Sequence, residues 1–187
     1  MNHLVPGTKN VLITGPPGVG KTTVIKKLSR GLNGGTCGFY TREIRDGGKR
    51  VGFELVSLKE DRRETLASVD FNTSYRVGRY GVKPSRLEPF LEEIENNLHE
   101  EREVICFLLD EIGKMELFSQ KFRRTVMQVL DSRFPVVATI MSSSHRYADA
   151  IKSREDTRLV EVSRENRDEL PGKLLKVVRE QYPRSSG

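Results

Sequence analysis

The chain has 187 residues, with 36% hydrophobic and 31% charged residues and a formal net charge of +6. Its longest apolar run, Val104 to Leu109, is much shorter than a membrane span, and no apolar signal segment precedes the first predicted strand. We therefore expect one domain over residues 1–187, acting in the cytoplasm as a monomer without a membrane partner, with residues 183–187 as a loose tail. Cys37 and Cys106 lie in predicted strands and are expected to be free core residues.

The first predicted unit is a strand, a glycine-rich loop and a helix. Residues 11–13 are typical of a short buried strand, and residues 22–32 of a helix that ends at an Asn-Gly-Gly stop signal. The segment between them, GPPGVGKT, has the spacing of a P-loop. Its glycines let several backbone N–H groups approach one anion, Lys21 can reach the β- and γ-phosphates, and the Thr22 hydroxyl can bind Mg²⁺. A chance glycine-rich turn is the alternative, and the flanking strand and helix argue against it.

The P-loop predicts that a nucleoside triphosphate and Mg²⁺ bind at the start of this helix, where unpaired N–H groups favour anions. The predicted nucleotide-binding residues are Gly15, Pro16, Pro17, Gly18, Val19, Gly20, Lys21, Thr22 and Thr23.

The next segment is predicted to be a β-hairpin over residues 36–58, inserted into the main fold, with Asp-Gly-Gly as its turn. The charged residues 59–66 are expected to form a loop, and residues 75–82 a short strand or turn. Apolar periodicity predicts the remaining elements. These are helices at residues 87–98, 120–130 and 170–182, strands at residues 104–109, 135–141 and 159–162, and a polar loop at residues 142–158. The alternation indicates an α/β fold with a mostly parallel sheet flanked by helices.

Asp110 and Glu111 directly follow the apolar run at residues 104–109. Because ligands collect at the carboxyl ends of parallel strands, this pair is expected near the P-loop, in the Walker B position. Asp110 is then a Mg²⁺ ligand, and Glu111 can orient and polarise the attacking water. Two acids that only cap a helix are the alternative explanation.

Five segments together resemble one family of proteins. They are GPPGVGKTT (15–23), GFYTREIRDGGKRVGFELVSL (38–58), VGRYGV (77–82), LDEIGKMELFS (109–119) and SRENRD (163–168). From about residue 11 to residue 170, the chain resembles the small thermostable nucleoside-triphosphatases of the cancer-related nucleoside-triphosphatase type. The resemblance implies a RecA-like P-loop fold with one strand inserted between the P-loop and Walker B strands.

The resemblance also implies hydrolysis of ATP, GTP, CTP, UTP and TTP, with weaker action on diphosphates. On this basis residues 15–22 bind phosphates, Asp110 and Thr22 bind Mg²⁺, and the catalytic residues are Lys21, Glu111 and Lys114. Lys114 either neutralises phosphate or holds Glu111, and an ordinary surface lysine is the alternative.

Several other positions are left open by the sequence. Thr139 either faces the γ-phosphate or simply fills a strand face, and the strand-face interpretation is favoured. His145 is expected to be solvated. Asn166 and Arg167 match the family segment without a defined role. The candidates for an arginine finger are Arg42, Arg45, Arg146, Arg154 and Arg158.

Two other functions remain as alternatives to a stand-alone hydrolase. The P-loop also suits a small-molecule or nucleotide kinase, although Glu111 favours water as the nucleophile. An RNA-associated nucleoside-triphosphatase module is the second alternative. The basic ends of the chain permit it, but no basic–aromatic pattern supports a nucleic-acid partner, and solvated surface charge is the simpler explanation.

Overall fold

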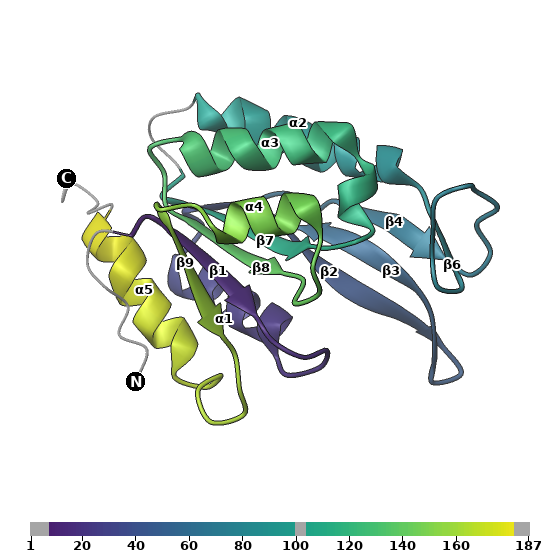
Figure 1. Ribbon diagram of the computed structural model, residues 1–187, viewed down its shortest axis with the longest axis horizontal. Coiled ribbons are helices and arrows are strands. Elements are labelled where there is room, and N and C mark those ends of the chain that lie inside the picture. The colour runs from purple at the N-terminus through teal and green to yellow at the C-terminus, as the bar shows by residue number, and fades with distance from the viewer. Residues whose placement is uncertain (1–7, 100–103, 182–187) are drawn as a thin grey trace.

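The computed structural model describes residues 8–99 and 104–181, and within these residues nine strands form one mixed sheet. Figure 1 shows the sheet with helices on both of its faces. In chain order the elements are β1 (Asn10–Thr14), α1 (Lys21–Gly31), β2 (Thr36–Asp46), β3 (Lys49–Ser57), β4 (Arg63–Ser68), β5 (Arg76–Val77), β6 (Tyr80–Val82), the 3₁₀ turn η1 (Pro84–Leu87), α2 (Glu88–Leu98), β7 (Cys106–Ile112), the 3₁₀ turn η2 (Glu116–Phe118), α3 (Gln120–Asp131), β8 (Val136–Ile140), α4 (Arg146–Lys152), β9 (Thr157–Glu161) and α5 (Leu170–Gln181).

The strand order is β5-β6-β4-β3-β2-β7-β8-β1-β9. The neighbouring pairs from β2 to β9 are parallel, whereas those from β2 to β5 are antiparallel. β8 therefore separates the P-loop strand β1 from β7, as the resemblance implies. The predicted α/β fold is confirmed. The antiparallel part is larger than the sequence indicated.

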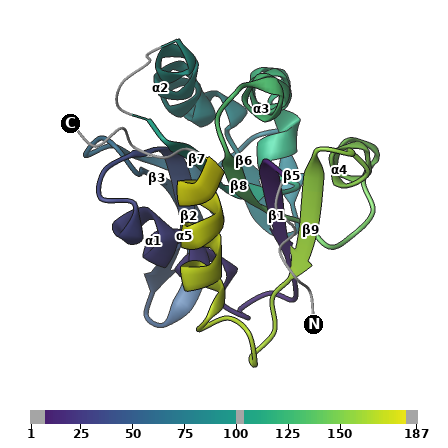
Figure 2. The ribbon, with the colours of Figure 1, turned by 90° about the vertical axis from the view of Figure 1, so that its left-hand side faces the viewer.

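Two hydrophobic cores fill the space between the sheet and its helices. The apolar faces of α2, α3 and α4 pack on one face of the sheet, and those of α1 and α5 pack on the other. Figure 2 shows the two groups of helices on opposite sides of the strands. The predicted stripe of α3 is buried, and the Ser119 hydroxyl accepts a hydrogen bond from the Phe122 N–H as the predicted N-cap. Cys37 and Cys106 are buried and free, as expected.

Residues 36–58 form the predicted hairpin, but it is not an insertion outside the main sheet. Residues 36–39, at the start of β2, pair in parallel with β7, and the rest of β2 continues into the hairpin. The close pairing requires a glycine at position 38. Gly38 has a φ of +129°, and a Cβ there would lie 1.9 Å from the Leu108 carbonyl oxygen. The hairpin and the strands beyond it therefore extend the sheet past β7.

Two predicted loops are wrong. β4 begins at Arg63 inside the expected loop at residues 59–66, and α4 lies inside the expected polar loop at residues 142–158. β9 also begins two residues earlier than predicted. The structure describes α5 up to Gln181, and Tyr182 and the tail predicted at residues 183–187 lie outside the described residues.

Candidate functional site

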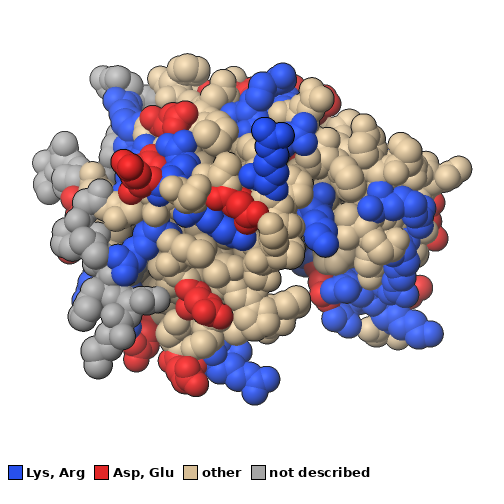
Figure 3. All heavy atoms as spheres, viewed as in Figure 1, with Lys and Arg blue, Asp and Glu red and all other residues tan. Residues whose placement is uncertain are grey.

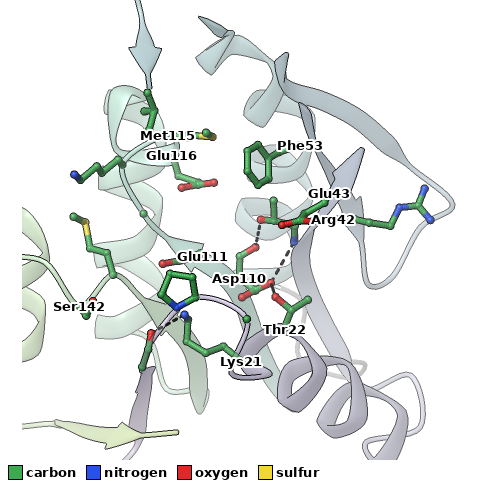
Figure 4. Close-up of a pocket in the computed structure, with 18 of the residues that line it drawn as sticks. Lys21, Thr22, Arg42, Glu43, Phe53, Asp110, Glu111, Met115, Glu116 and Ser142 are labelled. Atoms are coloured by element: carbon green, nitrogen blue, oxygen red, sulfur yellow. Dashed lines mark hydrogen bonds between the residues drawn. The ribbon is translucent and has the colours of Figure 1, made fainter. Parts of the chain in front are cut away.

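A cleft of about 660 Å³ lies where β1, β7 and β8 end, beside the β2–β3 hairpin (Figure 4). Most of the residues expected from the sequence line it: Gly15, Pro17, Gly18, Gly20, Lys21, Thr22, Thr23, Asp110, Glu111 and Lys114. Pro16 and Val19 do not line the cleft. Val19 is buried in the core with α1 and α5, and the Pro16 carbonyl lies 3.4 Å from the Lys21 ammonium.

The loop between β1 and α1 has the backbone of an anion-binding nest. Gly15, Gly18 and Gly20 have φ angles of +144°, +74° and +114°, which side-chain-bearing residues rarely adopt. A Cβ at Gly15 would also lie 2.8 Å from the Val162 carbonyl oxygen. The Lys21 ammonium donates a 2.9 Å hydrogen bond to the Gly15 carbonyl. The loop therefore holds Lys21 at the mouth of the nest. A bound phosphate can accept hydrogen bonds from the Lys21 ammonium in place of the Gly15 carbonyl.

The carboxylate of Asp110 is the most constrained polar group of the cleft. It is 2% exposed and accepts hydrogen bonds from Thr22 Oγ1 at 2.7 Å, Thr139 Oγ1 at 2.6 Å and the Thr41 N–H at 3.4 Å. Burial raises the pKa of Asp110, and the three hydrogen bonds oppose that rise. The contact with Thr139 shows that this threonine does more than fill a strand face. Thr41, on β2, is a site residue that sequence reasoning missed.

Two further carboxyl groups flank Gly113 in the same cleft. Burial is the main cause that raises the pKa of Glu111, and the charge of Lys21 opposes it. Glu116 is 4% exposed, and burial raises its pKa to about 8, with the charges of Glu111 and Asp110 adding to the effect. A Cβ at Gly113 would lie 2.9 Å from Glu116 Oε2 and 3.5 Å from Glu111 Cδ. A larger residue at position 113 would therefore crowd both acids, which Figure 4 labels in the same cleft.

Glu116 lies in the family segment LDEIGKMELFS (109–119), but no linear pattern shows that this acid is buried. Lys114 is exposed at the rim of the cleft and makes no hydrogen bond or ion pair within the described parts of the chain. It therefore does not hold Glu111 in this structure.

Among the candidate arginine fingers, Arg42 is the one that lines this cleft within residues 8–99 and 104–181. Arg42 donates to Glu54 at 2.6 Å, and Figure 4 shows its guanidinium pointing away from Asp110 and Glu111. Arg45 pairs with Glu43, and Arg154 pairs with Asp131 and Asp156. Arg167 lies beside the P-loop, with its guanidinium 3.4 Å from the Val19 carbonyl. His145 caps α4 by accepting from the Tyr147 N–H.

The donor set fits a magnesium ion held largely by phosphate and water. Thr22 and Asp110 offer two neighbouring oxygen ligands, and Mg²⁺ bound with nucleotides commonly uses one or two protein ligands. Within residues 8–99 and 104–181, no group of three or more His, Cys, Asp or Glu side chains could hold a metal ion. The protein thus offers two of the six ligands of an octahedral Mg²⁺ ion, which suits an ion that arrives with its substrate.

The P-loop lies between β1 and α1, and Asp110 and Glu111 lie near the end of β7, two places from β1 in the sheet. This arrangement defines a P-loop nucleoside-triphosphatase. Comparison with known proteins agrees: a family model described as "NTPase" matches residues 10–175. The chain belongs to this family.

Several relatives in this family match nearly the whole chain. Nucleoside-triphosphatase THEP1 of Natranaerobius thermophilus is 49% identical over 173 residues, covering 92% of this chain and 97% of the relative. The THEP1 of Thermotoga maritima is 45% identical over 170 residues, covering 90% and 95%. This extent and identity establish the protein as an enzyme of the nucleoside-triphosphatase family.

Solved structures give the same result for the fold. The crystal structure of THEP1 from Aquifex aeolicus superposes with a TM-score of 0.81 at 36% identity, covering 90% of this chain and 98% of that one. The solution structure of a human cancer-related nucleoside triphosphatase gives a TM-score of 0.79 at 35% identity, covering 92% and 98%. Among the described residues, none of the helices is long and apolar enough to cross a membrane.

Proposed function

We propose that this protein hydrolyses the γ-phosphate of ATP, GTP, CTP, UTP and TTP in the presence of Mg²⁺, with little base selectivity and weaker action on diphosphates. The observation that carries the proposal is the buried carboxylate of Asp110, held by hydroxyls from Thr22 and Thr139 at 2.7 and 2.6 Å. It lies beside Glu111 in a cleft that the P-loop also lines. This arrangement suits phosphoryl transfer to water.

The proposed roles follow from the chemistry of each side chain. The P-loop N–H groups and the Lys21 ammonium bind the β- and γ-phosphates. The phosphates replace the Gly15 carbonyl as the acceptor of the Lys21 hydrogen bond. Thr22 and Asp110 hold the Mg²⁺, which when bound neutralises phosphate charge. Glu111 accepts a proton from the attacking water while the water oxygen forms a bond to the γ-phosphorus. The bond from that phosphorus to the bridging oxygen then breaks, and the diphosphate leaves.

A carboxylate with a raised pKa is a better proton acceptor than an ordinary surface acid, so the burial of Glu111 favours this role. Base tolerance is proposed because the cleft residues assigned to the nucleotide bind phosphate and metal, which all nucleoside triphosphates share. Arg42 is engaged by Glu54 and points away from the acids, so we expect slow turnover by the protein alone.

The test is phosphate release from the five triphosphates and their diphosphates by the full chain, with Mg²⁺ and with a chelator. We expect kcat/KM values within about tenfold across the bases, lower values for diphosphates, and no release with chelator. Phosphate release from the triphosphate of only one base, or phosphate release that continues in the presence of the chelator, contradicts the proposal. Incubation of the protein with γ-labelled ATP and a panel of nucleoside and monophosphate acceptors tests the kinase alternative. Labelled acceptor without free phosphate would show phosphoryl transfer to the acceptor instead of hydrolysis.

A further inference from the structure

A second cleft of about 910 Å³ lies beside the first and contains none of the P-loop residues. Its walls come from the β5–β6 hairpin, the start of η1 and α2, the segment from η2 into α3, and the loop after β8. Val77, Lys114 and Met141 line both clefts, so the two are contiguous. The second cleft therefore opens from the first on the side of Lys114.

The walls of this second cleft are basic. Four lysine or arginine side chains line it, together with one acidic side chain, Glu88. The basic residues are Arg76, Lys114, Lys121 and Arg123. Figure 3 shows a hollow between the bulk of the molecule and the sheet extension on the right, with lysine, arginine and acidic side chains near it. Four cations facing one acid give a positive field inside a partly enclosed space, where charge acts more strongly than on an open surface.

Three of these cations have no carboxylate partner within residues 8–99 and 104–181. Arg76 donates to the Arg79 carbonyl at 3.0 Å, and Arg123 donates to the Leu117 carbonyl at 2.9 Å. Each guanidinium keeps further N–H donors, which form a fork that matches a phosphate group. Lys121 differs, since it pairs with acids of α2. The arginines and Lys114 thus offer uncompensated charge to an anionic ligand.

The same cleft has an exposed aromatic wall. Tyr75 is 45% exposed, which is unusual for a large apolar side chain in this protein. Its ring lies 5.2 Å from the ring of Phe118 with an interplanar angle of 49°, and both rings line the cleft. Aromatic rings held at a cleft wall beside arginines are a platform on which a planar base can stack.

We propose that the second cleft binds a nucleoside monophosphate, with its phosphate at Arg76 and Arg123 and its base against Tyr75. Two observations favour a small ligand over a nucleic acid strand. The volume falls in the range of small-molecule sites, and the cations line one cleft. The site goes beyond the proposed hydrolysis, because its lining contains none of the P-loop residues.

The test is a calorimetric titration of AMP, GMP, CMP and UMP into the full chain, with the P-loop filled by excess non-hydrolysable triphosphate and Mg²⁺, and again without it. We expect one monophosphate per chain under both conditions. Arg76→Gln, Arg123→Gln and Tyr75→Ala should each weaken binding by about tenfold or more. Arg124→Gln is the matched control, since Arg124 is the next residue on α3, is exposed and lines neither cleft.

Absence of monophosphate binding overturns the proposal, and so does equal weakening by Arg123→Gln and Arg124→Gln. Binding of a single-stranded oligoribonucleotide with steep salt dependence, in the absence of monophosphate binding, replaces the small ligand by a nucleic acid. None of these readouts needs turnover. Failure of the hydrolysis proposal appears instead in phosphate release, so the two failures are distinguishable.

Discussion

Replacement of Glu116 by glutamine should remove part of the pH dependence of folding stability. Burial raises the pKa of Glu116 from 4.5 to about 8 in the folded protein. Between these values the folded state binds about one more proton than the unfolded state. The free energy of unfolding therefore falls as the pH rises through this window, by on the order of 1 kcal/mol per pH unit. The loss sums to about 3–5 kcal/mol across the whole window.

Urea unfolding of the full chain at several pH values between 5 and 8 measures this effect. We expect the free energy of unfolding of Glu116→Gln minus that of the parent to rise steadily with pH. Burying an amide adds a cost that does not change with pH, so it does not alter this trend. Glu92→Gln removes an exposed acid of α2 and controls for the loss of one negative charge. Parallel stability curves for the parent and Glu116→Gln would refute the reasoning, because they would mean that this carboxyl binds no extra proton in the folded protein.

Two other substitutions test the site and the sheet. Thr139→Val removes the 2.6 Å hydrogen bond to Asp110 at nearly constant volume, so kcat for phosphate release should fall about 10- to 100-fold, and an unchanged kcat in steady-state kinetics would contradict this role. Gly38→Ala places a Cβ 1.9 Å from the Leu108 carbonyl oxygen at a positive φ, which should cost more than about 3 kcal/mol in thermal unfolding. Gly172→Ala, in α5 with nothing within 4 Å of the new Cβ, is the control and should be neutral or stabilising by up to about 1 kcal/mol. Equal melting temperatures for the two alanine variants would show that β2 and β7 do not pack so closely.

Features encoded in a few contiguous residues were predictable from the sequence. The P-loop nest and the Ser119 cap each depend on backbone conformations that nearby residue types select, and both are present. β4 is not evident in the sequence because its first residues, Arg63 and Glu64, are charged. Only the later residues Leu66 and Ala67 of this strand are buried. α4 was missed because it has seven residues, and its two buried ones, Ala148 and Ile151, are too few to establish a helical period.

The site was predictable only where it follows a single strand. Asp110 and Glu111 could be placed because an apolar run ends there. Thr41 and Thr139, which hold Asp110, come from positions 69 and 29 residues away, and only the pairing of β2 and β8 with β7 brings them together. The burial of Glu116 is likewise a property of the assembled fold.

The most direct test of the account compares triphosphate binding and phosphate release by the parent and by Glu111→Gln. Glutamine keeps the size and shape of the side chain but cannot take a proton from water. We expect triphosphate affinity within a few-fold of the parent and a kcat lowered by about 10²- to 10⁴-fold. A kcat within a few-fold of the parent would show that Glu111 does not activate the attacking water.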